Sequence, residues 1–269
     1  MKKSIATVSL GGKLTDKLEA IAAAGFESIE IFEPNLLSYE GTAREIARYT
    51  AELGLTMEVF QPFRDFEGVS EEQFRHNLDR AESKFDLMDE LGAPLMLVCS
   101  NTDNNIFDDE ERAAAQLYEL AERARRRGIR IGYEALAWGT HVNRFDKAWR
   151  IVQRANHANL GLIVDSFHTL VLHDDWSSLR DLPGERIFFV QLGDALRLDV
   201  DPLTLRRNHS KLPGQGDFDV PSFLRAVLAT GYAGTISLEI FNEKTDMSPR
   251  ETANAGLNSL ILMEKLARP

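Results

Sequence analysis

Eight short apolar runs rich in β-branched residues recur along the chain, with helical patterns between them. The runs span residues 4–10, 28–32, 56–63, 95–100, 129–136, 160–165, 187–192 and 235–241. The segments between them carry apolar residues at the spacing of one helix face, as in Leu14, Leu18, Ile21 and Ala22. This repeated strand-helix alternation predicts an α/β fold in which eight parallel strands close into a (β/α)8 barrel.

We expect one domain over residues 1–269, although the length alone also allows two domains. The chain has no Pro/Ser-rich linker and no low-complexity tract that would separate two units. An open doubly wound sheet is the alternative architecture. Against it, the first run continues as Ser9-Leu10-Gly11-Gly12-Lys13, without the G-x-G-x-x-G turn of dinucleotide-binding sheets. Glycines that are typical of helix ends precede several later strands, namely Gly25, Gly54, Gly92, Gly128 and Gly231.

The net charge disfavours some classes of binding partner, and the cysteine content indicates the cellular compartment. The chain has 31 Lys and Arg against 42 Asp and Glu, a formal charge of -11, which argues against nucleic acid or an anionic membrane as the main partner. The single cysteine, Cys99, excludes an internal disulfide and suits a reducing compartment, so we expect a cytoplasmic protein. The N-terminus has two lysines before an apolar stretch, as a secretory signal does, but this stretch is short and ends at Gly11 and Gly12. We interpret it as the first strand. A homo-oligomer is compatible with the sequence.

Four polar side chains fall at equivalent heights on four successive predicted strands. Side chains alternate in direction along a strand, and the carboxyl ends of barrel strands form the active-site face. In the fifth run this alternation points Glu134 into the barrel at the end of the strand, while Ile129, Ile131 and Tyr133 point outward and pack against helices. The same rule applied to the next three runs gives a set of four residues: Glu134, Asp165, Gln191 and Glu239.

A divalent metal ion is the simplest compensation for three converging carboxylates. Such carboxylates repel one another unless a cation or protons balance them. Four oxygen donors without a thiolate favour a hard ion, Mg²⁺ or Mn²⁺, over structural zinc. A single acid of this kind would more often pair with a loop base or a helix N-terminus, but four in phase favour a site.

Other residues near the strand ends could bind or transform a substrate. His168, three residues after Asp165, is a candidate general acid or base beside a metal, although a lone loop histidine is more often structural. Arg64 follows the third run, with a salt bridge to Asp65 or Glu67 as the alternative role.

The longest irregular stretch, residues 195–216, contains a basic cluster, residues 206–211, that includes Arg206 and Ser210. Arginines at the barrel mouth indicate capture of a substrate carboxylate. The aromatics Trp138, Phe66 and Phe241 could wall an apolar ring or simply pack.

These residues carry a family resemblance that covers nearly the whole chain. Glu134, Asp165-x-x-His168, Gln191 and Glu239 resemble the metal site of the sugar phosphate isomerase/epimerase superfamily, whose members share a xylose-isomerase-like TIM barrel. Within that superfamily, SIATVSL, IEIFE, FQPFRDFEG, VQLGDA and LPGQGDFDV resemble the bacterial 3-dehydroshikimate dehydratases of quinate and shikimate breakdown. Many of these enzymes carry a second, C-terminal domain, whereas this chain is expected to contain the barrel alone, since it stops at Pro269.

The resemblance implies a lyase that converts 3-dehydroshikimate to protocatechuate and water with Mg²⁺, Mn²⁺ or Co²⁺ as cofactor. The metal, held by Glu134, Asp165, Gln191 and Glu239, would stabilise the enolate formed when the proton next to the ketone leaves. His168 is then the candidate to take that proton, and Glu134 is the second catalytic candidate. Arg64 and Arg206, with Ser210, would bind the ring carboxylate. In the family pattern a serine precedes an arginine by four residues in the long loop, and here Arg206 precedes Ser210.

Three other functions remain open at this point. A sugar or keto-acid isomerase or epimerase would use Glu134 and Glu239 as a proton-exchanging pair and would leave the arginines idle. A metal-dependent endonuclease for damaged DNA shares the barrel, but it needs more metal-binding histidines and a basic DNA face. This chain has six histidines in total and is strongly acidic. A non-enzymatic binding module is the third alternative, and the four intact ligands argue against it.

Overall fold

The computed structural model describes residues 1–241 and 247–268, and its centre is a closed barrel of eight parallel strands. Neighbouring strands follow the order β1-β10-β7-β6-β5-β4-β3-β2, and β1 pairs with both β10 and β2 to close the ring. The strands are β1 (Lys3–Ala6), β2 (Ser28–Phe32), β3 (Thr56–Phe63), β4 (Leu95–Cys99), β5 (Arg130–Glu134), β6 (Leu160–Asp165), β7 (Ile187–Leu192) and β10 (Ile236–Leu238). The predicted (β/α)8 architecture is confirmed.

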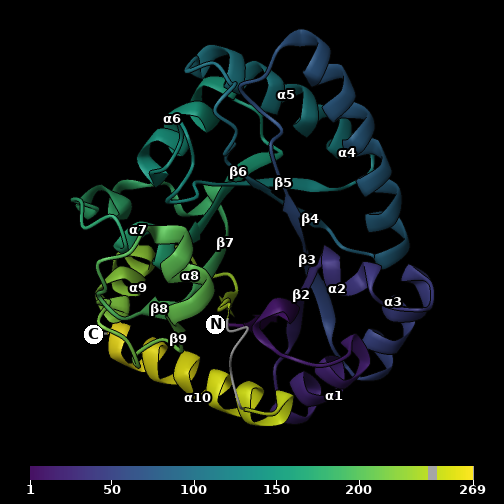
Figure 1. The fold of residues 1–269 in the computed structure, drawn as a ribbon, viewed down its shortest axis with the longest axis vertical. Coiled ribbons are helices and arrows are strands. Elements are labelled where there is room, and N and C mark those ends of the chain that lie inside the picture. The colour runs from purple at the N-terminus through teal and green to yellow at the C-terminus, as the bar shows by residue number, and fades with distance from the viewer. Residues whose placement is uncertain (242–246, 269) are drawn as a thin grey trace.

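Helices surround the barrel as an outer ring (Figure 1). The principal ones are α1 (Leu14–Ala24), α3 (Ala43–Glu52), α4 (Glu71–Leu91), α5 (Glu110–Arg126), α6 (Phe145–Ala155), α9 (Val220–Ala229) and α10 (Pro249–Ala267). Helix α10 packs against both α9 and α1, and so joins the two ends of the ring. Shorter helices are α2 (Glu33–Leu37), α7 (Ser166–Leu170) and the 3-10 turns Thr7–Ser9, Ser177–Asp181 and Gly184–Arg186. None of the helices within the described ranges is long and apolar enough to cross a membrane.

Local sequence signals explain where several helices begin and end. The side chain of Thr42 accepts a hydrogen bond from the N–H of Glu45, and the side chain of Glu45 accepts one from the N–H of Thr42. This reciprocal pair is a capping box at the start of α3. Gly25 and Gly92 end α1 and α4 with φ angles of 97° and 69°, a left-handed conformation that favours glycine. These ends direct the chain into β2 and β4, so the helix-stop glycines predicted from the sequence do set the positions of barrel strands.

Two apolar layers fill the inside and the outside of the barrel. The inner layer comprises Val59, Leu95, Leu97, Cys99, Leu136, Ile163 and Phe189. Ile131 and Tyr133 belong to the outer layer against the helices, as their predicted phase requires. At Gly132 a Cβ would lie 2.5 Å from Cγ1 of Ile163, so the missing side chain lets Ile163 occupy the barrel interior.

The segment after β7 is more ordered than the sequence indicated. It contains helix α8 (Pro202–His209) and a small antiparallel pair, β8 (Asp194–Ala195) with β9 (Ser210–Lys211), where we expected an irregular loop. The buried carboxylate of Asp194 accepts hydrogen bonds from the backbone N–H groups of Gly214, Gly216 and Phe218. Asp194 therefore ties the VQLGDA and PGQGD segments together and fixes α8 over the barrel mouth.

Candidate metal centre and active site

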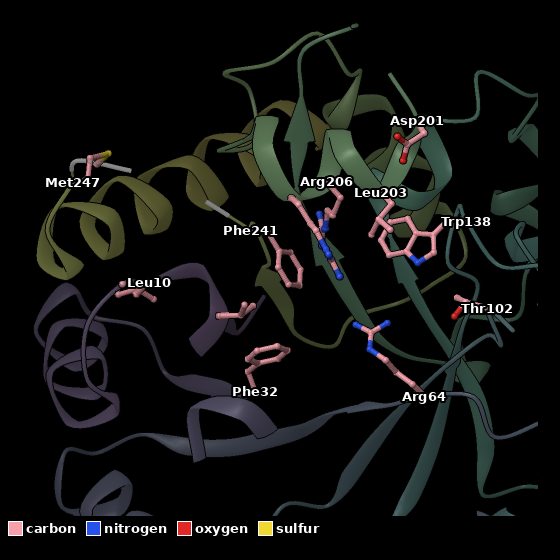
Figure 2. Close-up of a pocket in the computed structure, with 13 residues that line it drawn as sticks. Leu10, Phe32, Arg64, Thr102, Trp138, Asp201, Leu203, Arg206, Phe241 and Met247 are labelled. Atoms are coloured by element: carbon pink, nitrogen blue, oxygen red, sulfur yellow. The ribbon is translucent and has the colours of Figure 1, made fainter. Parts of the chain in front are cut away.

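The barrel mouth opens into a cavity of about 950 Å³ (Figure 2). Its walls come from segments that follow the carboxyl ends of the strands and from α8, as expected for a (β/α)8 barrel. Figure 2 shows the guanidinium groups of Arg64 and Arg206 directed toward each other across this space. The lining residues are Val8, Leu10, Gly11, Phe32, Arg64, Thr102, Trp138, Asp201, Leu203, Arg206, Arg207, Phe241 and Met247.

The four predicted ligands lie together beneath this cavity. Glu134 and Asp165 end β5 and β6, Gln191 pairs in register with Asp165, and Glu239 directly follows β10. All four residues are at least 95% buried. Oxygens of Glu134 and Asp165 and a ring nitrogen of His168 lie within 4.8 Å of one another. The structure therefore brings together the residues that the alternation of the strands had placed at one height.

Arg206 connects two of these carboxylates and is almost fully buried. Its Nη2 donates to Oδ2 of Asp165 at 2.8 Å and also to Oε2 of Glu239. The guanidinium lies 4.8 Å from the centre of the Phe167 ring and 5.2 Å from that of Phe241. Its Nε and Nη1 are buried without a partner among the described residues. Arg206 was expected only as a substrate-binding group, and the structure shows that it also forms the floor between the cavity and the carboxylates.

The donor set and its unpaired atoms fit a hard divalent cation. Oε1 of Glu134 and Oε1 of Gln191 are buried and accept no hydrogen bond from any residue that the structure describes. A buried polar atom left without a partner costs about 1–3 kcal/mol, and coordination to a cation would satisfy both oxygens. Glu134, Gln191 and the two carboxylates that contact Arg206 thus offer oxygen ligands at the ends of four strands.

The charge balance of this centre is also unfavourable without a further cation. Besides Glu134, Asp165 and Glu239, a fourth buried carboxylate, Glu30, lies in the same network, and Arg206 is the one guanidinium that contacts the group within the described ranges. Burial raises the pKa of Asp165 to about 7, although the charge of Arg206 opposes the rise. Burial and the charge of Glu239 raise the pKa of Glu134 and of Glu30 well above the usual value. Positive charge is what this site lacks.

His168 is held in one tautomer by the backbone. Its Nδ1 accepts a hydrogen bond from the N–H of Ala137 at 3.1 Å, so the neutral ring carries its proton on Nε2, which lies 3.9 Å from Oδ2 of Asp165. Burial lowers the pKa of His168 well below its ordinary value, and the charges of Arg206 and Arg64 lower it further. This arrangement makes His168 a hydrogen-bond donor. The expected role as proton acceptor stays a prediction, and in this tautomer the one lone pair of the ring is engaged by Ala137.

Arg64 is free to bind a ligand, whereas its neighbours anchor the loop that carries it. Its side chain makes no hydrogen bond or ion pair with another described residue, and the alternative pairing with Asp65 or Glu67 is not observed. Oδ1 of Asp65 instead accepts from the backbone and hydroxyl of Thr102. Oε1 of Glu67 accepts from the N–H of Asn101 at 2.9 Å and from the Tyr133 hydroxyl at 2.8 Å.

Ser210, predicted to bind the substrate, and Phe66, for which core packing was the alternative, lie away from the cavity. Ser210 is buried in β9, and its hydroxyl donates to the backbone oxygen of Arg206, so it does not line the cavity and supports Arg206 from behind. Phe66 packs in the outer core with its ring centre 5.5 Å from Phe63 and 5.8 Å from Phe74. Trp138 and Phe241 do line the cavity.

The sequence analysis missed several groups of the site. Phe32 and Thr102 line the cavity, and nothing in the local sequence marked them. Arg207, a member of the predicted basic cluster, lines it too. Glu30 and Gln61 lie in the buried network of the ligands. For these two the signal was available, because the alternation in β2 and β3 turns both side chains inward as it does for the four ligands.

Comparisons with known proteins agree with this barrel along the whole chain. The family model described as xylose isomerase-like TIM barrel matches residues 18–263. The 3-dehydroshikimate dehydratase of Pseudomonas putida is 52% identical over 269 residues, which cover 100% of this chain and 42% of that protein. That of Pseudomonas aeruginosa is 54% identical with the same coverage. A solved structure of a xylose isomerase-like TIM barrel/4-hydroxyphenylpyruvate dioxygenase fusion protein has a TM-score of 0.98 at 52% identity, covering 100% of this chain and 43% of that one. The chain thus spans about two fifths of the length of these relatives.

Proposed function

The chain belongs to the xylose isomerase-like TIM barrel family, and from that premise we propose that it is a metal-dependent 3-dehydroshikimate dehydratase. The reaction converts 3-dehydroshikimate to protocatechuate and water. The observation that carries this proposal is a buried four-oxygen centre at the same barrel mouth as two guanidinium groups. That of Arg64 has no partner among the described residues, and that of Arg206 has unpaired Nε and Nη1 atoms. A substrate with both a ketone and a carboxylate suits that pairing, and the names of the two Pseudomonas relatives specify such a substrate.

Glu134, Asp165, Gln191 and Glu239 would hold the metal, because they converge in one buried centre that includes two unpartnered oxygens. When bound there, Mg²⁺, Mn²⁺ or Co²⁺ supplies Lewis-acid stabilisation of the negative charge that develops on the ketone oxygen. The oxygen-rich donor set favours Mg²⁺ or Mn²⁺ among these ions.

Arg64 and Arg206 would bind the ring carboxylate. Arg64 has no competing partner in the described part of the chain, and two nitrogens of Arg206, Nε and Nη1, are unpaired among the described residues. A guanidinium can hold a carboxylate with two parallel hydrogen bonds, which fixes orientation as well as position. Nη2 of Arg206 now donates to Asp165 and Glu239. If these carboxylates held a metal, Nη2 would also be available to the substrate. Arg206 would thereby exchange one set of carboxylates for another.

Proton transfer falls to Glu134 in this arrangement, since His168 has no free lone pair. The Glu134 carboxylate takes the proton from the carbon next to the ketone. Its conjugate acid then returns the proton to the departing hydroxyl, which leaves as water, so that atoms and charges balance. His168 donates a hydrogen bond from Nε2 and orients the reacting groups. Tautomerisation of the resulting dienone to a catechol drives the sequence forward.

Product analysis tests the proposal directly. The purified protein with Mn²⁺ is incubated with 3-dehydroshikimate, and in parallel with shikimate, which has the ring carboxylate but no ketone. We expect protocatechuate in amounts equal to the 3-dehydroshikimate consumed, and no product from shikimate. An isomerised, non-aromatic product would instead support the isomerase alternative, and absence of turnover would contradict the proposal.

A further inference from the structure

Glu30 is a buried carboxylate that contacts the ligands without lining the cavity. It lies on β2, its side chain is inaccessible to solvent, and it makes three side-chain hydrogen bonds. Oε2 accepts from Nε2 of Gln191 at 2.7 Å and from Nε2 of Gln61 at 3.1 Å. Oε1 accepts from the hydroxyl of Ser237. Every partner of Glu30 is therefore a donor.

The bond to Gln191 decides which end of its amide is available to a cation. A side-chain amide presents an NH₂ group at one end and an oxygen at the other, and only the oxygen can coordinate a metal. Oε2 of Glu30 accepts from both Gln61 and Gln191, while Oε1 faces the Ser237 hydroxyl. Oε2 therefore remains an acceptor whether Glu30 is ionised or carries a proton on Oε1, and it selects the NH₂ end of Gln191. Oε1 of Gln191 is left buried and unpartnered among the described residues. Without Glu30 nothing in this contact would distinguish the two ends.

Gln61 connects Glu30 to a second predicted ligand, Glu239. Its Nε2 donates to Oε2 of Glu30 and also to Oε1 of Glu239 at 2.7 Å. The amide thus bridges two carboxylates and holds one oxygen of Glu239 in place. Glu30 acts directly on one of the four predicted ligands and, through Gln61, on another.

We propose that Glu30 is a positioning residue of the metal centre, which sets the amide of Gln191 and, through Gln61, the carboxylate of Glu239. The inference rests on the metal site of the proposed function. Groups that hydrogen-bond to metal ligands typically change metal affinity about 10- to 100-fold when they are lost. A buried residue that merely filled space would change the stability of the fold and leave metal affinity alone.

Two substitutions separate orientation from bulk. Glu30→Met keeps the approximate size but removes the strong acceptor. Glu30→Gln keeps an oxygen that can accept from Gln191 and Gln61, and its NH₂ can donate to the Ser237 hydroxyl, which is also an acceptor. Gln116→Ala is the matched control, because Gln116 is a buried amide that accepts from the N–H of Val69 and donates to its carbonyl, away from the site.

The readout is the dissociation constant of Mn²⁺ from chelator-treated protein, by electron paramagnetic resonance titration, with the thermal midpoint of the metal-free protein recorded for each variant. We expect Glu30→Met to weaken Mn²⁺ binding about 10- to 100-fold, Glu30→Gln to remain within about threefold of wild type, and Gln116→Ala to lower the midpoint without changing affinity. Glu30→Ala, which leaves room for water, serves if the Met variant does not fold.

Unchanged affinity in Glu30→Met or Glu30→Ala would overturn the inference while leaving the proposed function intact. An equal loss in Gln116→Ala would also overturn it, since the effect would then follow from general destabilisation. If the wild-type protein shows no saturable Mn²⁺ binding, the metal site of the proposed function fails, and this inference fails with it.

Discussion

Replacing Glu67 by glutamine should remove one well-defined contribution to the pH dependence of stability. Glu67 is 2% exposed, and burial raises its pKa from 4.5 to about 7 in the folded protein. Oε1 accepts two hydrogen bonds, whereas Oε2 is buried without a partner in the described structure. The folded state therefore holds the Glu67 proton more tightly than the unfolded state does, and this carboxyl costs stability wherever it is ionised.

The sign and size of the effect follow from proton linkage. An acid whose pKa is higher in the folded state makes the protein less stable as the pH rises from its unfolded value to its folded value, and the loss then levels off. A rise from 4.5 to about 7 corresponds to about 3 kcal/mol in the fully ionised state. Between pH 5 and pH 8 we therefore expect the wild-type protein to lose about 2 to 3 kcal/mol relative to Glu67→Gln.

The measurement is urea unfolding of both proteins between pH 5 and pH 8, with chelator present so that metal binding does not contribute. The side-chain oxygen of glutamine can keep both hydrogen bonds that Oε1 of Glu67 accepts. All other titrating groups are the same in the two proteins, so their contributions cancel when one free energy of unfolding is subtracted from the other. That difference should grow in favour of the variant as the pH rises. Parallel curves would refute the reasoning and would mean that Glu67 titrates as an ordinary exposed acid.

The remaining predictions concern activity and packing at the barrel mouth. Arg64→Ala should raise KM about 10- to 100-fold with little change in kcat, because a charged hydrogen bond to the substrate is lost; an unchanged KM in steady-state assays would count against the clamp. His168→Gln should keep most of kcat, since glutamine can still donate, whereas His168→Ala should lose at least about a hundredfold; equal losses in both would restore the proton-acceptor role. Gly193→Ala would place a Cβ 2.6 Å from Nη1 of Arg206 and 2.7 Å from the backbone oxygen of Glu239. It should lower the free energy of unfolding by about 1–3 kcal/mol and weaken Mn²⁺ binding, and wild-type affinity would contradict this.

Most of the barrel could be predicted because apolar runs and helix-stop glycines mark each strand locally. The largest errors fall at the first and last strands, where β1 ends at Ala6 and β10 at Leu238. The apolar sequence continues past both, to Leu10 and Phe241, because these side chains wall the cavity and do not extend the sheet. Hydrophobicity alone does not separate these two uses of an apolar residue.

The positions of the candidate ligands were predictable for a geometric reason, since parallel barrel strands end at one edge and side chains alternate. The same argument would have found Glu30 and Gln61 had it been applied to β2 and β3. The place of Arg206 could not be predicted, because it depends on how α8 packs over the mouth and on long-range bonds to Asp165 and Glu239. The tautomer of His168 likewise depends on one backbone N–H from a different strand-end loop.

Metal-dependent turnover tests the central claim most directly. Chelator-treated protein, verified to be free of metal, is mixed with 3-dehydroshikimate, and aromatic absorbance is followed before and after Mn²⁺ is added. The proposed site predicts no absorbance change without the metal and formation of protocatechuate once it is present. Full turnover by the verified metal-free protein would contradict the role assigned to Glu134, Asp165, Gln191 and Glu239.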